Sequence, residues 1–154
     1  FLRSENPRTE SVPLALAEPT YGWRTAVDLA YAEVGTSRAT GYSQPGECIM
    51  SVQRWVHAGG GAWVGGGDPV SNYAGAERLT ADQAVPGDII QYEWAADPSQ
   101  WVSGIHTVLV TGVNGDGSLR IVESNNPAGS GLVTANDNWE PQPPAGFEAV
   151  AWRF

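Results

Sequence analysis

The chain of 154 residues contains no lysine, and its eight basic residues are all arginines. With 17 acidic residues the formal net charge is −9, so the surface lacks the positive charge that neutralises the phosphates of nucleic acid or of an anionic membrane. Residues 59–67 are rich in glycine, but they lack the Gly-Lys-Ser/Thr ending of a phosphate-binding loop. We therefore expect no nucleic-acid partner and no cofactor.

Long apolar runs are missing too. No stretch of 18 apolar residues is present, so we expect no membrane insertion. Three prolines and a lack of periodicity indicate a linker or N-terminal arm over residues 1–20. The remaining residues, 21–154, have the length of one domain, and we expect a single monomeric unit.

Only one cysteine, Cys48, is present, so the chain cannot form an internal disulfide. It lies where a loop gives way to a helical pattern that begins near Glu47. The unpaired N–H groups and the positive end of the helix dipole lie in this first turn, and both favour a thiolate. The position indicates a reactive cysteine rather than an inert one.

Hydrophobic spacing and turn residues give a coarse secondary structure. Apolar residues at three- and four-residue spacing predict helices, and runs of β-forming residues bounded by Gly, Pro, Asn and Asp predict strands. The predicted helices cover residues 23–34, 47–58 and 70–78; the predicted strands cover residues 89–94, 106–113, 119–123 and 148–154. Helices followed by an antiparallel meander predict an α+β fold.

A cysteine nucleophile needs a base, and the chain offers only His57 and His106. His57 follows Cys48 by nine residues on the same predicted helix, which separates them by roughly 13 Å. His106 opens a predicted strand, where its side chain can project into a cleft. The sequence therefore favours His106 as the base.

The turn at residues 114–117 decides what faces His106. If Asn114 and Gly115 form the centre of the turn, His106 faces Glu123; if the centre moves by one residue, His106 faces Asn125 and Glu123 is its diagonal neighbour. Both registers place His106, Glu123 and Asn125 on one face of the sheet. A carboxylate and an amide beside the imidazole could orient it.

These motifs resemble those of the CHAP family of cysteine amidases and peptidases. The matching segments are Gly46-Glu47-Cys48, Pro86-Gly87-Asp88-Ile89-Ile90, His106-Thr107-Val108 and Glu123-Ser124-Asn125. The resemblance covers residues 20–154 and implies a papain-like fold with helices packed on an antiparallel sheet.

The resemblance also implies a site and a substrate. Cys48 would be the nucleophile, His106 the base, and Glu123 and Asn125 their polar partners. The implied reaction is cleavage of amide bonds in bacterial peptidoglycan, either at the sugar–peptide junction, as in an N-acetylmuramoyl-L-alanine amidase, or within the peptide. The implied location is secreted or associated with the cell wall, as a bacterial enzyme or a phage lysis protein.

The related NlpC-type peptidases are the closest alternative. They usually begin the site with Asp-Cys-Ser-Gly and carry a second histidine about a dozen residues after the first. Here Ile49-Met50-Ser51 follows the cysteine, and position 118 is serine, so both positions favour the CHAP family. Some CHAP lysins bind calcium through aspartates before the cysteine, but residues 36–47 contain no aspartate, and we expect no metal.

An oxyanion on the substrate would need hydrogen-bond donors. The backbone N–H of Cys48 at the helix N-terminus is one candidate, and Gln44 or Tyr42 from the preceding loop could supply a second.

Three tryptophans in loop-like stretches, Trp63, Trp101 and Trp139, could stack on sugars of the substrate. The alternative is that they cover the edge of the core. Two further functions also fit the sequence: an acyl transferase with the same thiol chemistry, and a non-catalytic wall-binding module. A separate wall-targeting domain would suit either an enzyme or a binding module.

Overall fold

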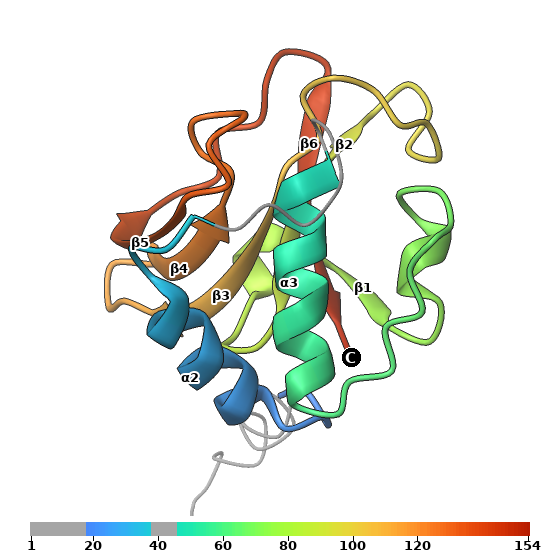
Figure 1. Ribbon diagram of the computed structural model, residues 1–154. Helices are drawn as coiled ribbons and strands as arrows, with labels where there is room; N and C mark the ends of the chain where they lie inside the picture. Colours follow the sequence, from blue (N-terminus) through green and yellow to red (C-terminus); the bar gives the residue numbers. More distant parts are fainter. Residues whose placement is uncertain (1–17, 38–45) are drawn as a thin grey trace, which may run out of the picture.

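The computed structural model describes residues 18–37 and 46–154. Two α-helices, α2 (Trp23–Glu33) and α3 (Gly46–Ala58), accompany a six-stranded antiparallel sheet with the order β1-β6-β2-β3-β4-β5 (Figure 1). The strands are β1 (Glu77–Thr80), β2 (Ile89–Trp94), β3 (Thr107–Val113), β4 (Leu119–Ser124), β5 (Val133–Trp139) and β6 (Phe147–Arg153). Short 3-10 helices, η1 (Ser71–Tyr73) and η2 (Ala81–Gln83), flank β1. The α+β class predicted from the sequence is confirmed.

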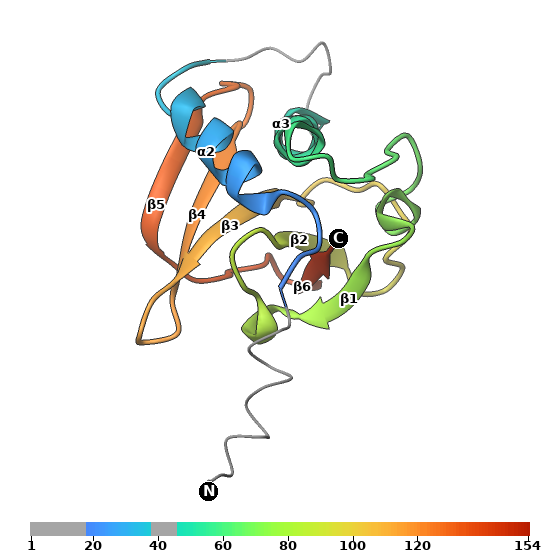
Figure 2. The same ribbon diagram turned by 90° about the horizontal axis from the view of Figure 1, so that it is seen from below.

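Both helices lie on the same side of a curved sheet (Figures 1 and 2). Helix α3 packs on the central strands β3 and β4, and α2 packs against α3. Within the described ranges, no helix has the length and apolar character needed to span a membrane.

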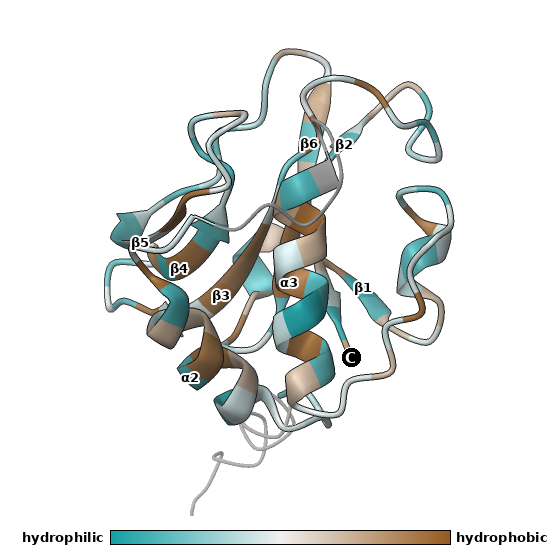
Figure 3. Cartoon of the chain, viewed as in Figure 1, coloured by the Kyte–Doolittle hydropathy of each residue, from teal (hydrophilic) through white to brown (hydrophobic). Residues whose placement is uncertain are grey.

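The core lies between α3 and the sheet. Val52, Trp55 and Val56 of α3 are fully buried against Leu109 of β3 and Val122 of β4. Each such aliphatic side chain contributes about 1.5–3 kcal/mol by leaving water. Figure 3 shows the result, with β3 and β4 mainly hydrophobic and the surrounding loops mainly hydrophilic. Packing of this stripe fixes the rotation of α3, and with it the direction of every side chain in its first turn.

A buried carboxylate joins the two helices. Glu33, at the end of α2, accepts hydrogen bonds from the Trp55 indole and from the Arg54 guanidinium of α3. Glu33 is buried, so these donors compensate for the loss of water around its charge. This contact sets the position of α2 along α3.

A second buried ion pair joins the entrance of β2 to the end of β6. Arg153 donates two hydrogen bonds to Asp88, of 2.9 and 2.7 Å, and the carboxylate also accepts the Val85 N–H. The carboxylate raises the pKa of Arg153, which stays charged. Gly87 just before it has φ +94°, and a Cβ there would lie 2.4 Å from Trp23, so only glycine fits this turn.

Two predictions about secondary structure were wrong. The helix expected over residues 70–78 is limited to η1, because Gly75 turns the chain at φ +91° and the residues from Glu77 pair with β6. Strand β5 was not predicted at all. It lies at the edge of the sheet and buries mainly Val133, so its sequence lacks the apolar alternation that indicates a strand.

Replacement of Arg153 by methionine should lower the free energy of unfolding by about 3–5 kcal/mol, because Asp88 would remain buried without its cation. Urea denaturation of Arg153→Met would measure the loss. Arg120→Met is the matched control, since Arg120 is exposed and should change stability by about 0.5 kcal/mol or less. Equal stability of the two variants would contradict the role assigned to the Asp88–Arg153 pair.

Candidate active site

Cys48 is the third residue of α3, and its side chain lies at the wall of a cleft. It is only 4% exposed, yet it lines a hollow of about 330 Å³ together with His106, Asn125 and Asn126. The loop before β3 forms the opposite wall, from Ser103 onward. A buried thiol that opens into a cleft can meet a substrate while most of bulk water is excluded.

His106 lies between the thiol and a carboxylate. Its Nε2 atom is 2.6 Å from Oε1 of Glu123, and its ring also forms a hydrogen bond with Cys48. Because Nε2 is taken by the carboxylate, Nδ1 is the nitrogen that remains for the thiol. The arrangement is a nucleophile, a base and an orienting group in series.

The surroundings stabilise the charged form of His106. Burial disfavours the imidazolium, but the hydrogen bonds and charges of Cys48 and Glu123 outweigh it and raise the pKa of His106 from 6.5 to about 9. A pKa raised on folding contributes stability that is fully present below about pH 6.5 and is lost as the pH rises through 9. At neutral pH the imidazole therefore holds its proton in the resting site.

The hairpin between β3 and β4 sets this register. The turn is centred on Gly115 and Asp116, the second of the two predicted positions, because the Gly117 N–H donates to the Asn114 carbonyl at 3.0 Å; the Asn114 N–H also donates to the Ser118 carbonyl, so the loop is one residue longer than predicted. An irregularity between Val110 and Gly112 then shifts the pairing by one residue. Beyond it Val108 faces Glu123, which is the pairing of the second predicted register, so Glu123 is a diagonal neighbour of His106 on the same face and does not lie directly opposite it.

Asn125 leaves the strand geometry, with φ +64°. Its Oδ1 atom accepts the N–H groups of Gly129 and Gly131, at 2.9 and 3.0 Å, and so shapes the loop that follows β4. It also lines the cleft beside Cys48.

The neighbouring Asn126, which the sequence did not single out, donates to Oε2 of Glu123 at 3.4 Å. Asn126 thus supplies the carboxylate with an amide partner that the sequence did not predict.

Ser124 connects the two halves of the site. Its neighbours Glu123 and Asn125 belong to the site, whereas the Ser124 hydroxyl donates to the backbone carbonyl of Glu47 at 3.3 Å. Strand β4 thus carries the carboxylate and also holds the first turn of α3, where Cys48 lies. No local pattern predicts this contact, because it joins residues 77 positions apart.

His57 plays no part in the site, as expected from its distance. It lies in the last turn of α3, and its Nε2 atom contacts the carbonyl of Trp63.

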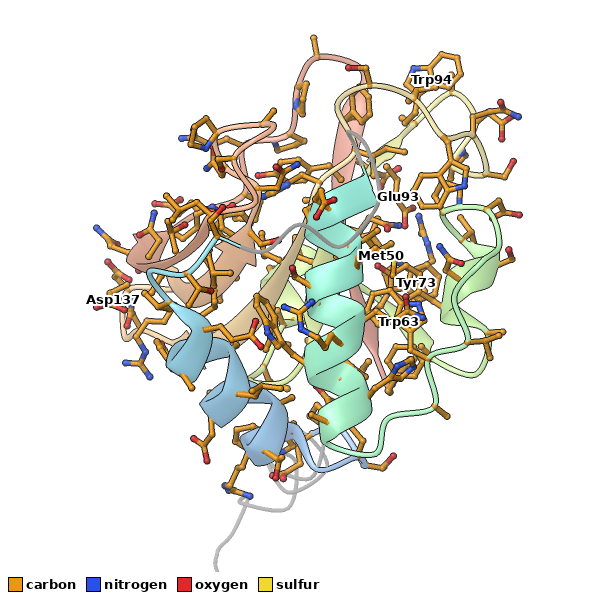
Figure 4. All side chains as sticks on the ribbon, in the orientation of Figure 1. Met50, Trp63, Tyr73, Glu93, Trp94 and Asp137 are labelled. Carbon is orange, nitrogen blue, oxygen red and sulfur yellow. The ribbon has the colours of Figure 1, made fainter. Side chains whose placement is uncertain are left out.

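The three tryptophans proposed as sugar contacts have different environments. Trp63 is 2% exposed and packs against Tyr73 and Phe154, so the prediction that it binds substrate is wrong and the core alternative holds. Figure 4 shows Trp63 beside Tyr73. Trp101 is 45% exposed, and its indole donates to Gly67. Trp139 ends β5 and is stacked on Tyr92 beside the site.

The candidates for the oxyanion site are only partly described. The Cys48 N–H lies in the first turn of α3, at the positive end of the helix dipole. Tyr42 and Gln44, predicted as second donors, lie outside the described residues.

The comparisons with known proteins give one match. The family model of the CHAP domain matches residues 20–125, a span that contains Cys48, His106, Glu123 and Asn125. No curated protein and no solved structure matches the chain significantly.

Glu123→Gln should lower the pKa of His106 below about 9, and addition of Cys48→Ala should bring it below 6.5, because only burial would then act on the ring. Titration of the imidazole resonances by NMR measures both shifts. His57 is the only other histidine and serves as an internal reference. An unchanged His106 titration in both variants would contradict the geometry of the pair.

Ser124→Ala should destabilise the fold by about 0.5–1.5 kcal/mol and should lower kcat more than it changes KM, because α3 loses its anchor on β4. Chemical denaturation and steady-state kinetics would measure the two effects. Ser51→Ala is the control, since the buried Ser51 hydroxyl on α3 has no hydrogen-bond partner among the described residues. If both variants behave alike, the Ser124 contact does not position the site.

Proposed function

The chain belongs to the CHAP family, and we propose that it is a cysteine-dependent hydrolase of amide bonds in bacterial peptidoglycan. CHAP domains act on peptidoglycan, and many are amidases or peptidases. The observation that carries the proposal is the series Cys48, His106 and Glu123 at the wall of a cleft. A wall-binding module would have no use for a thiol paired with an imidazole in this way.

The reaction starts from a thiolate–imidazolium pair, in which Nδ1 of His106 already carries the proton of the Cys48 thiol. The thiolate attacks the carbonyl carbon of the scissile amide, and a carbon–sulfur bond forms as the carbonyl π electrons move onto oxygen. The N–H of Cys48 at the start of α3 is the natural donor to this oxyanion. The tetrahedral intermediate collapses when the carbon–nitrogen bond breaks and the imidazolium protonates the leaving amine.

In the second half, water hydrolyses the thioester. His106 removes a proton from the water, whose oxygen adds to the carbonyl carbon. Collapse of this second intermediate breaks the carbon–sulfur bond and releases the carboxylic acid, and the thiolate and the imidazolium are restored. Glu123 keeps the Nε2 proton in place throughout, which leaves Nδ1 for the chemistry.

Either the sugar–peptide junction or a bond within the peptide could be the target. An enzyme of this kind would work at the cell wall, so we propose that it is secreted, wall-associated or released during phage lysis. Amine rather than water as the acyl acceptor would make it a transferase, which the reaction products distinguish.

Cys48→Ala and His106→Ala should each lower the rate by at least about 10³-fold, because members of such a site act as a unit. Digestion of purified peptidoglycan followed by mass spectrometry of the fragments measures the loss and identifies the bond. Glu123→Gln should cost less, because a neutral amide still orients the ring.

His57→Ala is the matched control and should keep most of the activity, since His57 lies in the last turn of α3 and its ring contacts the Trp63 carbonyl. Near-normal turnover by Cys48→Ala would rule out covalent catalysis by the thiol. Tight binding to peptidoglycan without any released fragment would favour a wall-binding module.

A further inference from the structure

A second cleft, of about 320 Å³, adjoins the His106 ring and is lined by Glu123 but not by Cys48. It shares His106 and Asn126 with the cleft of Cys48, so the two hollows meet at the imidazole. Its other walls come from β5 and the segment after it, residues 136–142, and from Tyr92 of β2. Figure 3 shows β5 as largely hydrophilic, in contrast to β3 and β4.

Polar side chains dominate the lining of this second cleft, which we call the amide-lined cleft. Four side-chain amides line it, and they belong to Asn126, Asn136, Asn138 and Gln142. Two carboxylates, Glu123 and Glu140, accompany them. No arginine of the described residues lines the cleft, and the chain has no lysine. The imidazolium of His106 also lines the cleft and offsets the charge of Glu123, which leaves the negative charge of Glu140. The cleft can therefore exchange hydrogen bonds with amides and hydroxyls, whereas a carboxylate would meet the like charge of Glu140.

Several contacts hold the lining in place before any ligand binds. The Oδ1 atom of Asn136 accepts the N–H of Asn138 at 2.9 Å, which orients the first amide. The N–H of Gln142 donates to the hydroxyl of Tyr92 at 2.8 Å, and the Tyr92 ring stacks on Trp139 with a centroid distance of 6.4 Å. A wall fixed in this way binds with less loss of entropy than a mobile loop.

The mechanism determines which part of the substrate the amide-lined cleft would hold. His106 must protonate the leaving amine, so the amine has to lie within hydrogen-bond distance of the imidazole. The chain attached to that amine leads away from the carbonyl carbon that is bonded to Cys48. The amide-lined cleft shares His106 with the cleft of Cys48 but is not lined by Cys48, so it is the hollow that this chain can enter.

We infer that this cleft is the leaving-group subsite and that it selects a peptide bearing an uncharged carboxamide over one bearing a free carboxylate. The inference rests on the proposed hydrolysis of peptidoglycan amides. A carboxamide can donate its N–H to Glu140 and accept from Asn138 or Gln142. A carboxylate has no proton to donate and meets the like charge of Glu140.

The expected selectivity is modest, because Glu140 is exposed to solvent. Two like charges about 5 Å apart in water disfavour binding by about four-fold, and salt screens part of this effect. We expect the wild type to prefer the carboxamide by about four- to ten-fold in kcat/KM at low ionic strength.

The experiment uses two synthetic muropeptides that are identical except that the glutamate of the stem peptide, on the leaving-amine side, carries a free carboxyl or a carboxamide. Hydrolysis by the wild type gives the ratio of kcat/KM. Calorimetric binding of the same pair to Cys48→Ala gives the ratio of affinities without chemistry. The preference should decrease as salt is raised.

Variants at position 140 test the charge directly. Glu140→Gln should reduce the preference, and Glu140→Arg should reverse it. Asp28→Asn is the matched control, because it also removes one negative charge but lies exposed on α2. It should leave the preference unchanged.

The outcomes separate the subsite from the proposed function. If neither muropeptide is hydrolysed but Cys48→Ala binds the carboxamide form more tightly, the subsite stands and the proposed hydrolysis fails. If hydrolysis or binding is equal for the two muropeptides, or if Glu140→Arg leaves the ratio unchanged, the subsite is wrong while the hydrolase can stand. Failure of Cys48→Ala to bind either muropeptide would also overturn the subsite.

Discussion

The hydrogen bond between His106 and Glu123 is the interaction on which the rest of the site depends. It fixes which ring nitrogen faces the thiol, and together with Cys48 it keeps the imidazole charged in spite of burial. The bond exists only because β3 and β4 pair in one register, which an irregularity after Val110 sets. A slip by one residue would move Glu123 to the other face of the sheet.

Two other interactions position the nucleophile, Cys48. The stripe of apolar residues on α3 fixes its rotation against β3 and β4, and the hydroxyl of Ser124 holds the carbonyl of Glu47 in its first turn. One strand, β4, thus carries the carboxylate on one side and the anchor of α3 on the other. Successive side chains of a strand point to opposite faces, so the adjacent residues Glu123 and Ser124 can fill these two roles. The close packing of the core beneath α3 therefore aligns the Cys48 thiol with the His106 imidazole.

Much of this arrangement was predictable from the sequence, because it depends on local patterns. Helical spacing predicted α2 and α3 to within one residue at each end, and the turn residues before β2 and after β3 marked the strands. The order of Cys48, His106 and Glu123 was enough to predict the site, since alternation places His106 and Glu123 on one face in either register. Edge strand β5 was missed because its buried residue is Val133 at the first position, so its sequence shows no alternation of apolar and polar residues. Burial of Trp63 was missed because glycines around it indicate a loop, whereas its ring packs with aromatic residues distant in sequence. The contacts of Ser124 and Asn126 depend on tertiary distances that no pattern in the chain encodes.

The central claim is that the imidazole of His106 activates the thiol of Cys48. The most direct test is the rate of Cys48 alkylation by iodoacetamide as a function of pH, in the wild type and in His106→Ala. The account predicts that the wild-type thiol still reacts at pH about 6, where a free thiol of ordinary reactivity is almost fully protonated, and that His106→Ala reacts at least about tenfold more slowly there. Equal rates in the two proteins across this range would contradict it.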